Sequence, residues 1–320
     1  MRGDDLAAFP IDGNTPDDVR LLHHILSRQP ATGQTINTCN CGTAMRFLTA
    51  YFAQKKGCEV VLDGSERMRQ RPINQLVEAL QSIGAEIEYQ CNKDLPPVRI
   101  KGRTLAHKAV TLNQPQSTQF VSALMLIGTE VQTDCRSPYI DMTQAIIGSR
   151  KSDADIIERD WSAAAFWYEY IALKGGCLHL DGLRHDSLQG DKIIVQIFRH
   201  FGVETAFDST GATVCKSFAA DHAPCVVNFQ TCPDLYPAVF ATCHRLNIPG
   251  HFSGLQSLTL KESNRLQAMQ QMTTATADAM SYGDHRIAMA LTVAGYNVDD
   301  TLCISKSYPQ FLKQWKMLQS

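Results

Sequence analysis

The sequence predicts an α/β protein made of two similar domains, and three observations support this fold class. Apolar runs with helical spacing alternate with short strand-like segments along the chain. One stretch of helices, strands and turns recurs 118 residues further on without a gap. Finally, 320 residues, 44% of them hydrophobic, are enough for two ordinary domains and a substantial core.

The repeat aligns residues 56–86 with residues 174–204. In each copy an apolar helix ends at Lys-Gly, a short strand leads to a Leu-Asp-Gly turn, and a second helix ends at a glycine before an alternating strand. Comparable helix–glycine–strand units occur at residues 119–131 and 237–252. Repetition on this scale predicts duplicated domains rather than a solenoid, whose repeats are shorter. Two similar halves that face each other would leave a cleft, a common location of small-molecule sites.

The first copy of the repeat shows the local signals. Apolar residues keep helical spacing from Ile73 to Ile83, so a helix is predicted there. Pro72 suits the first helical position, and Gly84 suits the residue that follows a helix. Residues 85–89 alternate between apolar and polar side chains, as a half-buried strand should.

Charge and cysteine content exclude several classes of protein. Thirty basic and 32 acidic residues give a net charge of −2, which argues against nucleic-acid or membrane-surface partners. No apolar run reaches membrane-spanning length and the N-terminus lacks signal-peptide character, so we expect a cytoplasmic protein. We interpret the eleven cysteines as free thiols in a reducing cytosol, with Cys39 and Cys41 as small packing residues. The sequence contains no P-loop and no metal-ligand spacing, so we expect no cofactor and no metal.

Four arginines lie beside two glycine turns, in the segments 40–46 and 62–72. Gly42 and Thr43 precede an apolar helical run, so their N–H groups could open a helix N-terminus toward an anion. An extended backbone in the second segment would direct its alternating arginines to one side; these are Arg67, Arg69 and Arg71. Arginine forks bind carboxylate or phosphate, so the pattern predicts an anion site. The alternative is a solvated basic edge.

The two segments read N-x-G-T-A-M-R and D-G-x-x-R-M-x-x-R-P-I, and together they resemble the EPSP synthases (3-phosphoshikimate 1-carboxyvinyltransferases). The resemblance implies an inside-out α/β barrel fold with two domains, each of three β-α-β-α-β-β units, and a cleft between them. We place the domains at residues 1–156 and 157–320. The resemblance also implies transfer of the enolpyruvyl group of phosphoenolpyruvate to the 5-hydroxyl of shikimate 3-phosphate, on the pathway to chorismate and the aromatic amino acids. We expect a monomer that acts on these two small molecules.

Residues 117–119 precede an apolar run, where Ser or Thr is by default an N-cap. The resemblance implies a second role for this segment in binding both substrates. For shikimate 3-phosphate, the implied contacts in the first half of the chain are Ser117, Thr118, Gln119 and Tyr139. For phosphoenolpyruvate they are Gly42, Arg67 and Gln119. Arg136 stands where the family usually has a substrate-contacting serine.

Asp234 lies in a predicted loop before an apolar helix, where it is by default a cap. The resemblance implies that it binds shikimate 3-phosphate and takes the proton of its hydroxyl, because a neutral alcohol is too weak a nucleophile to attack an enol carbon. Lys261 and Arg265 lie four residues apart in K-E-S-N-R, so on one helix they would share a face. The resemblance assigns Lys261 to shikimate 3-phosphate and Arg265 to phosphoenolpyruvate. Glu262 would exchange a proton with the enol methylene.

Asp284-His285-Arg286 opens another apolar helix, and Asp284 suits its N-cap position. The resemblance implies that Arg286 binds the carboxylate or phosphate of phosphoenolpyruvate, and that Lys306 contacts the same ligand. Without the resemblance, Lys306 would be read as an ordinary solvated lysine.

Some features of the family are not found. Its Lys-Ser motif is missing, and we expect the chain to begin too late to contain it. The stretches 146–160 and 269–284 look short, either through real deletion or because flexible segments are not included. Two alternatives therefore stay open: the sister enzyme that uses UDP-N-acetylglucosamine, and a non-catalytic binding homologue without the lysine motif.

Overall fold

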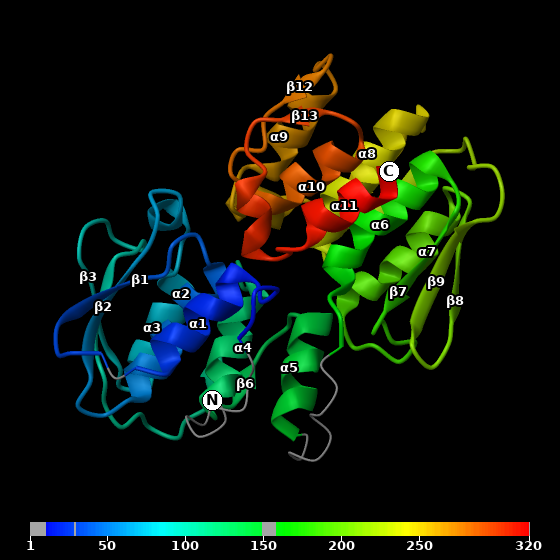
Figure 1. The fold of residues 1–320 in the computed structure, drawn as a ribbon. Helices are drawn as coiled ribbons and strands as arrows, with labels where there is room; N and C mark the ends of the chain where they lie inside the picture. The colour runs from blue at the N-terminus through cyan, green and yellow to red at the C-terminus, as the bar shows by residue number, and fades with distance from the viewer. Residues whose placement is uncertain (1–10, 29, 149–157, 320) are drawn as a thin grey trace. The chain divides into compact units, whose positions relative to one another are not determined.

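The computed structural model describes residues 11–28, 30–148 and 158–319. The chain divides into two compact units, up to Gly148 and from Ser149 on, and each is described by itself (Figure 1). The domain boundary that we placed at residue 156 lies outside the described residues. Both units combine helices with small sheets, so the predicted α/β class is confirmed.

The described elements of the first unit are, in chain order, α1 (Asp17–Leu26), β1 (Gln34–Asn37), α2 (Gly42–Gln54), β2 (Glu59–Asp63), η2 (Met68–Gln70), α3 (Asn74–Ser82), β3 (Glu86–Tyr89), β4 (Val98–Lys101), β5 (Val110–Thr111), α4 (Thr118–Leu126), β6 (Val131–Gln132) and α5 (Pro138–Gly148). A four-stranded sheet has the order β1-β2-β4-β3, in which only β1 and β2 are parallel. Helices α2 and α3 pack against this sheet (Figure 1). Strands β5 and β6 form a separate parallel pair.

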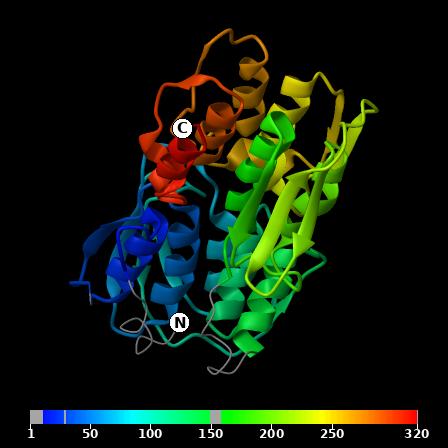
Figure 2. The same ribbon diagram turned by 45° about the vertical axis from the view of Figure 1, so that its right-hand side comes forward.

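The described elements of the second unit are α6 (Trp161–Lys174), β7 (Cys177–Asp181), η4 (Gly190–Ile193), α7 (Ile194–Arg199), β8 (Val203–Phe207), β9 (Gly211–Lys216), β10 (Cys225–Asn228), η5 (Pro233–Leu235), α8 (Tyr236–Leu246), β11 (Gly250–Ser253), η6 (Gln256–Leu260), α9 (Arg265–Met272), β12 (Asp278–Ala279), α10 (His285–Val293), β13 (Asn297–Val298), η7 (Leu302–Lys306) and α11 (Phe311–Gln319). Strands β7, β9 and β8 form an antiparallel sheet, with α6 and α7 packed against it (Figure 2). Two parallel strand pairs follow, β10-β11 and β12-β13.

The predicted repeat is present in the structure. The series β2, α3, β3, β4 corresponds in order to β7, α7, β8, β9, and in each sheet the last strand of the series lies between the other two. Gly84 follows α3 with φ +101°, and Gly202 follows α7 with φ +77°. These angles favour glycine, so both predicted helix stops are confirmed. The unit predicted at 237–252 also contains a helix and a strand, but its left-handed residue is Asn247.

The position predicted for Pro72 in the first turn of a helix is wrong. Helix α3 begins at Asn74, and its N-cap is Ile73, whose N–H donates to the carbonyl of Asp94 at 2.9 Å. Arg71, which precedes the proline, is extended, as a residue before proline prefers. Pro72 and Ile73 therefore lie in the turn between η2 and α3, before the first turn of the helix.

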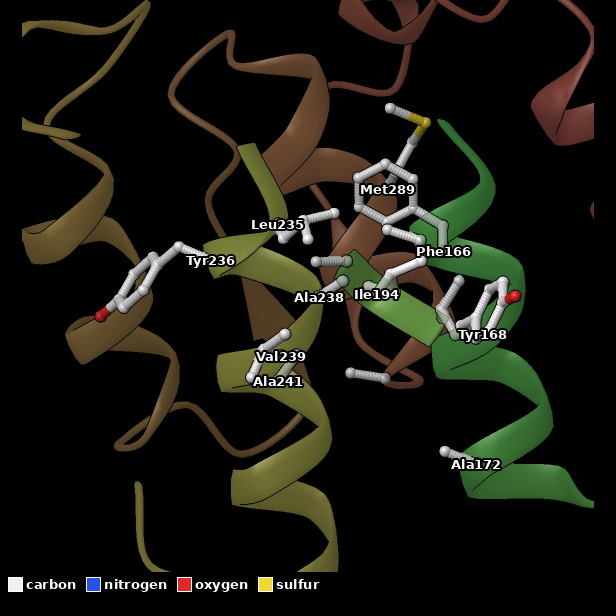
Figure 3. Close-up of a cluster of buried hydrophobic side chains, with 14 of the residues drawn as sticks. Phe166, Tyr168, Ala172, Ile194, Leu235, Tyr236, Ala238, Val239, Ala241 and Met289 are labelled. Atoms are coloured by element: carbon white, nitrogen blue, oxygen red, sulfur yellow. The ribbon is translucent and has the colours of Figure 1, made fainter. Parts of the chain in front are cut away.

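The core of the second unit lies between α6, α8 and α10. Figure 3 shows Phe166 of α6, Leu235 directly before α8 and Met289 of α10 directed into the space between these helices, where all three are fully buried. Helix α6 has buried residues on all its faces, as expected for a helix enclosed by other elements. The polar residues at the N-terminal end of α6 are therefore held in place by a helix that is packed on all sides.

The interpretation of all cysteines as free thiols is wrong for one pair. Cys177 of β7 and Cys215 of β9 lie directly opposite each other, with a Cα–Cα distance of 4.2 Å, and form a disulfide. They are 38 residues apart, and only the register of the sheet brings them together. The other nine cysteines, all in the described part of the chain, form no disulfide. Cys41 is buried and caps α2, whereas Cys39 is exposed.

Glu169 is a fully buried carboxyl group in the middle of α6, and neither of its oxygens has a hydrogen-bond partner among the described residues. Burial raises its pKa well above the usual value. The folded protein therefore keeps a proton that the unfolded chain releases, and stability falls as pH rises above the ordinary glutamate pKa. We expect Glu169→Met to increase the free energy of unfolding by about 1–3 kcal/mol at pH 8.

The gain from Glu169→Met should be smaller at pH 5, because the wild-type carboxyl is then closer to its protonated form in both states. Urea denaturation at the two pH values measures this difference. The control is Glu204→Met, at an exposed position of β8. Equal gains at both pH values would show that the buried carboxyl is not the cause.

Candidate active site

Asp234 of the second unit is surrounded by three cationic side chains. It lies in η5, directly before α8, and it does not cap that helix. Its Oδ1 accepts from Lys261 Nζ at 3.0 Å and from Arg265 Nη1 at 2.7 Å, and its Oδ2 lies 3.1 Å from Arg286 Nη2. The structure therefore brings together four residues that the sequence predicted for the site.

The prediction that Lys261 and Arg265 share a helix face is wrong. Lys261 is an extended residue that ends η6, whereas Arg265 is the first residue of α9. Asn264 between them caps α9 by accepting from the Gln267 N–H, so the chain changes direction before the helix. The two cations still meet, because both reach Asp234.

Arg265 is the most enclosed cation of this group, with 1% of its side chain exposed. Its Nε and Nη2 donate to the two oxygens of Asp284, at 2.8 and 3.2 Å, while Nη2 also reaches Glu262 at 3.1 Å. Asp284 accepts in addition from the Arg286 N–H at 3.0 Å, so its predicted N-cap position on α10 is confirmed. One buried carboxylate thus holds both a guanidinium group and a helix end.

Glu262 and Lys306 complete the group. Glu262 Oε1 lies 3.2 Å from Lys306 Nζ, and the other oxygen of Glu262 binds Arg265. Lys306 lies at the end of η7, far along the chain from the other members. We call these seven side chains the charge cluster; they are Lys261, Arg265, Arg286, Lys306, Asp234, Glu262 and Asp284.

Burial and the cations act in opposite directions on the carboxylates of the charge cluster. Burial alone would raise the pKa of Asp234, but Arg286, Lys261 and Arg265 outweigh it and hold that pKa well below its usual value. For Asp284, burial is likewise outweighed by Arg265, and its pKa is lowered. Burial, aided by Arg286, lowers the pKa of His285 to about 3, so this histidine is neutral. The cluster thus combines four basic side chains with three acidic ones.

Gly42 in the first unit lies at the predicted helix N-terminus, as the first residue of α2. A methyl group built on Gly42 would lie 2.5 Å from Arg46 Nη1 and 3.0 Å from Arg71 Nη2. Glycine is therefore what allows two buried guanidinium groups to approach the backbone here. Sequence reasoning included these arginines in the anion-binding segments but did not select them as site residues.

The prediction of an extended backbone at residues 67–71 is wrong, because Met68–Gln70 form the 3₁₀ helix η2. The three arginines therefore differ in surroundings. Arg71 is buried, and Arg69 is exposed and makes a fork to Asp63 with contacts of 2.8 and 2.6 Å. Arg67 is half-buried and donates to Gln70 at 3.3 Å. Arg67, the predicted substrate contact, does not lie beside Gly42 in the way that Arg71 does.

Gln119 is joined to the α2 N-terminus, because its Nε2 donates to Thr43 Oγ1 at 3.0 Å. Ser117 caps α4 by accepting from the Gln119 N–H at 3.3 Å, so the default N-cap reading is confirmed. Thr118 is the first residue of α4, and Tyr139 is the second residue of α5. Helices α2 and α4 pack together, and so do α4 and α5.

Asp191 and Ser162 were missed by sequence reasoning. Asp191 of η4 is 2% exposed and accepts a hydrogen bond from Ser162 Oγ in the first turn of α6. Asp160 caps α6 through the Ser162 N–H at 2.8 Å. Asp160 and Ser162 at the start of an apolar helix could have drawn attention to this region, but their partner Asp191 follows Ser162 by 29 residues.

Other features of the described residues lie apart from this group. A pocket of about 640 Å³ between α9, β12 and β13 is lined by none of the predicted site residues. Its lining includes Asp278 and Asp299 but no lysine or arginine, which does not suit phosphorylated ligands. The described residues contain no group of three or more His, Cys, Asp and Glu placed to hold a metal ion. None of the described helices combines the length and apolarity needed to cross a bilayer.

Comparison with known proteins identifies relatives. The chain matches the family model of EPSP synthase (3-phosphoshikimate 1-carboxyvinyltransferase) over residues 14–155, 141–274 and 269–315. It is 32% identical to a 3-phosphoshikimate 1-carboxyvinyltransferase of Bacteroides fragilis, over 97% of this chain and 88% of that protein. With the protein of the same name from Colwellia psychrerythraea it shares 29% identity, over 85% of this chain and 76% of the relative.

A solved structure has the same fold. The EPSP synthase of Acinetobacter baumannii superimposes with a TM-score of 0.67, at 20% identity, over 90% of this chain and 79% of that one. The segments of the family match meet at residues 141–155 and 269–274, near the two stretches that looked short. The alignment with the Bacteroides relative also runs over 372 positions, more than the 320 residues of this chain.

Proposed function

The chain belongs to the EPSP synthase family, and we propose that it transfers the enolpyruvyl group of phosphoenolpyruvate to the 5-hydroxyl of shikimate 3-phosphate, with release of phosphate. The observation that carries this proposal is the charge cluster of the second unit. Motifs from four distant parts of the sequence meet there around Asp234, and four cations suit two anionic substrates.

In the proposed addition step, the substrate oxygen forms a bond to C2 of phosphoenolpyruvate while Asp234 takes the hydroxyl proton. Glu262 enters this step as the protonated acid and gives its proton to C3 of phosphoenolpyruvate, which completes the tetrahedral intermediate and leaves Glu262 ionised. Asp234 lies at 17% side-chain exposure and Glu262 at 10%, and Arg265 binds both. One guanidinium group therefore holds the two proposed proton carriers in fixed positions.

In the proposed elimination step, the bond from C2 to the phosphate oxygen breaks. The C3 methyl group returns a proton to Glu262, the double bond forms again, and the proton on Asp234 leaves with the phosphate. Arg286 and Lys306 would stabilise the departing charge, since a preorganised cation costs no reorganisation when charge develops. Lys261 would bind the phosphate of shikimate 3-phosphate. Arg265 reaches phosphoenolpyruvate only if the substrate displaces one of its carboxylates.

The ion pairs of Asp234 make its pKa depend on whether substrate is bound. With three cations around it, Asp234 has a low pKa and is a weak base. Anionic substrates would draw Arg286 and Lys261 toward themselves and weaken that effect, so the pKa of Asp234 rises when the substrates are bound. In the first unit, we propose that Gly42, Arg67, Gln119, Ser117, Thr118 and Tyr139 keep the substrate contacts implied by the resemblance.

The test is release of inorganic phosphate from phosphoenolpyruvate by the purified chain. We expect release only when shikimate 3-phosphate is also present. A response to UDP-N-acetylglucosamine instead would favour the sister enzyme. Binding of both ligands without release of phosphate would favour the non-catalytic homologue.

We also propose that the protein acts as a monomer in the cytoplasm, without a nucleic-acid partner, and that residues 1–156 and 157–320 are its domains. The near balance of 30 basic and 32 acidic residues supports the absence of a nucleic-acid partner. Light scattering coupled to size exclusion measures the oligomeric state, and a mass of twice 35.5 kDa would contradict the monomer.

A further inference from the structure

Asp191 is a buried carboxyl group that no step of the proposed reaction uses. It lies in η4, which packs against α6 and α7, and 2% of the residue is exposed. Its Oδ2 accepts from Ser162 Oγ, whereas its Oδ1 has no hydrogen-bond partner among the described residues. A buried carboxylate normally has both oxygens satisfied, so this oxygen needs an explanation.

Arg286 has the complementary feature. It is 9% exposed, its Nη2 binds Asp234, and its Nη1 is a buried donor without a hydrogen-bond partner in the described part of the chain. Asp191 and Arg286 act on each other electrostatically, yet no hydrogen bond joins them. Nη1 of Arg286 therefore makes no hydrogen bond to the described residues, although the carboxyl group of Asp191 is close enough to interact with it electrostatically.

Four titratable groups face Asp191 from the elements around it. Asp234 comes from η5, Arg286 from α10 and Asp160 from the N-cap of α6, and the thiol of Cys232 precedes η5. Burial and then Asp234 raise the pKa of Asp191 to about 7, against the opposing effects of Ser162 and Arg286. A protonated carboxyl explains why Arg286 does not bind it.

We propose that Asp191 is a positioning residue that holds a proton when the enzyme is active and thereby leaves Arg286 to bind the anionic substrate. This inference rests on the proposed enolpyruvyl transfer. An ionised Asp191 would place a second negative charge near Asp234 and would attract Nη1 of Arg286. Arg286 would then bind phosphoenolpyruvate less strongly, because its positive charge is already paired. Loss of the proton therefore weakens substrate capture.

The test is the pH dependence of kcat/KM for phosphoenolpyruvate. In the wild type we expect an alkaline decline with a midpoint near the pKa of about 7, by about tenfold per pH unit above it. Asp191→Asn has the shape of the protonated acid and does not ionise, so this decline should disappear. Ser162→Ala removes a hydrogen bond that favours the ionised form, and it should move the decline to higher pH.

A structural role alone would lower activity equally at every pH and would not abolish the alkaline decline in one variant and move it to higher pH in the other. The matched control is Asp186→Asn, an exposed acid paired with Arg184, which should leave the profile unchanged. Persistence of the decline in Asp191→Asn would overturn the proposal. So would an unchanged profile in Ser162→Ala, which tests it even where the first variant does not fold.

A second readout separates this inference from the proposed function. The infrared difference between the wild type and Asp191→Asn, to which Glu169 contributes equally in both proteins, should show a protonated carboxyl band that disappears near neutral pH. This titration does not depend on turnover. A wild type that shows the band without releasing phosphate would contradict the proposed function alone, whereas an active wild type without the band would contradict only the role of Asp191.

Discussion

Asp234→Asn is expected to lower kcat for phosphate release by about 10²–10⁴-fold, the range for loss of a general base. The amide cannot accept the hydroxyl proton, although its oxygen can still accept from Arg265 Nη1, which lies 2.7 Å away in the wild type. The substitution also removes the negative charge with which Arg286 and Lys261 form ion pairs. KM for phosphoenolpyruvate should therefore stay level or fall while kcat collapses, and steady-state kinetics measures both.

The control for Asp234→Asn is Asp186→Asn, at an exposed ion pair of the same unit, which should leave kcat unchanged. Circular dichroism verifies that both variants are folded. If Asp234→Asn keeps kcat within about threefold of the wild type, a range smaller than any general-base effect, another group takes the proton. A rise in KM with kcat intact would instead make Asp234 a binding residue.

Local structure was predictable from the sequence where its cause lies within a few residues. Asp284 and Ser117 cap their helices, and Gly84 ends one, because a cap or a left-handed residue acts through the nearest turn of backbone. The repeat was predictable for the same reason, since each copy has its own stops and turns. The failures at Pro72 and at the three arginines arose where a 3₁₀ turn replaced an extended segment.

Which residues form the candidate site was predictable only through the resemblance. The hydrogen bonds and ion pairs between those residues were not predictable at all. Nothing in K-E-S-N-R indicates that Lys261 and Arg265 belong to different elements and still converge on Asp234. The contact of Asp191 with Ser162 and the disulfide of Cys177 depend on how distant segments pack. Such pairs are set by tertiary structure, which a pattern of spacing along one chain does not contain.

Arg265→Ala is expected to lower the free energy of unfolding by about 3–5 kcal/mol at pH 7, because it leaves a buried charge without its partner. Arg265 is the cation that Asp284 binds through two hydrogen bonds, and the Asp284 side chain is fully buried. In the wild type, this arrangement stabilises the fold above the ordinary aspartate pKa and the effect is lost as pH falls. In the variant, burial raises the pKa of Asp284, so stability should fall as pH rises.

The loss caused by Arg265→Ala should therefore grow with pH, and urea denaturation at pH 4.5 and pH 7.5 measures it. Adding Asp284→Asn to Arg265→Ala should recover part of the loss at pH 7.5, because the stranded charge is gone. The matched control is Arg69→Ala, which breaks a similar fork to Asp63 at an exposed position and should have little effect at either pH. If Arg265→Ala costs no more than Arg69→Ala, the charge cluster does not hold the second unit together. If Asp284→Asn recovers nothing, the cost comes from lost packing around α9 rather than from an unpaired carboxylate.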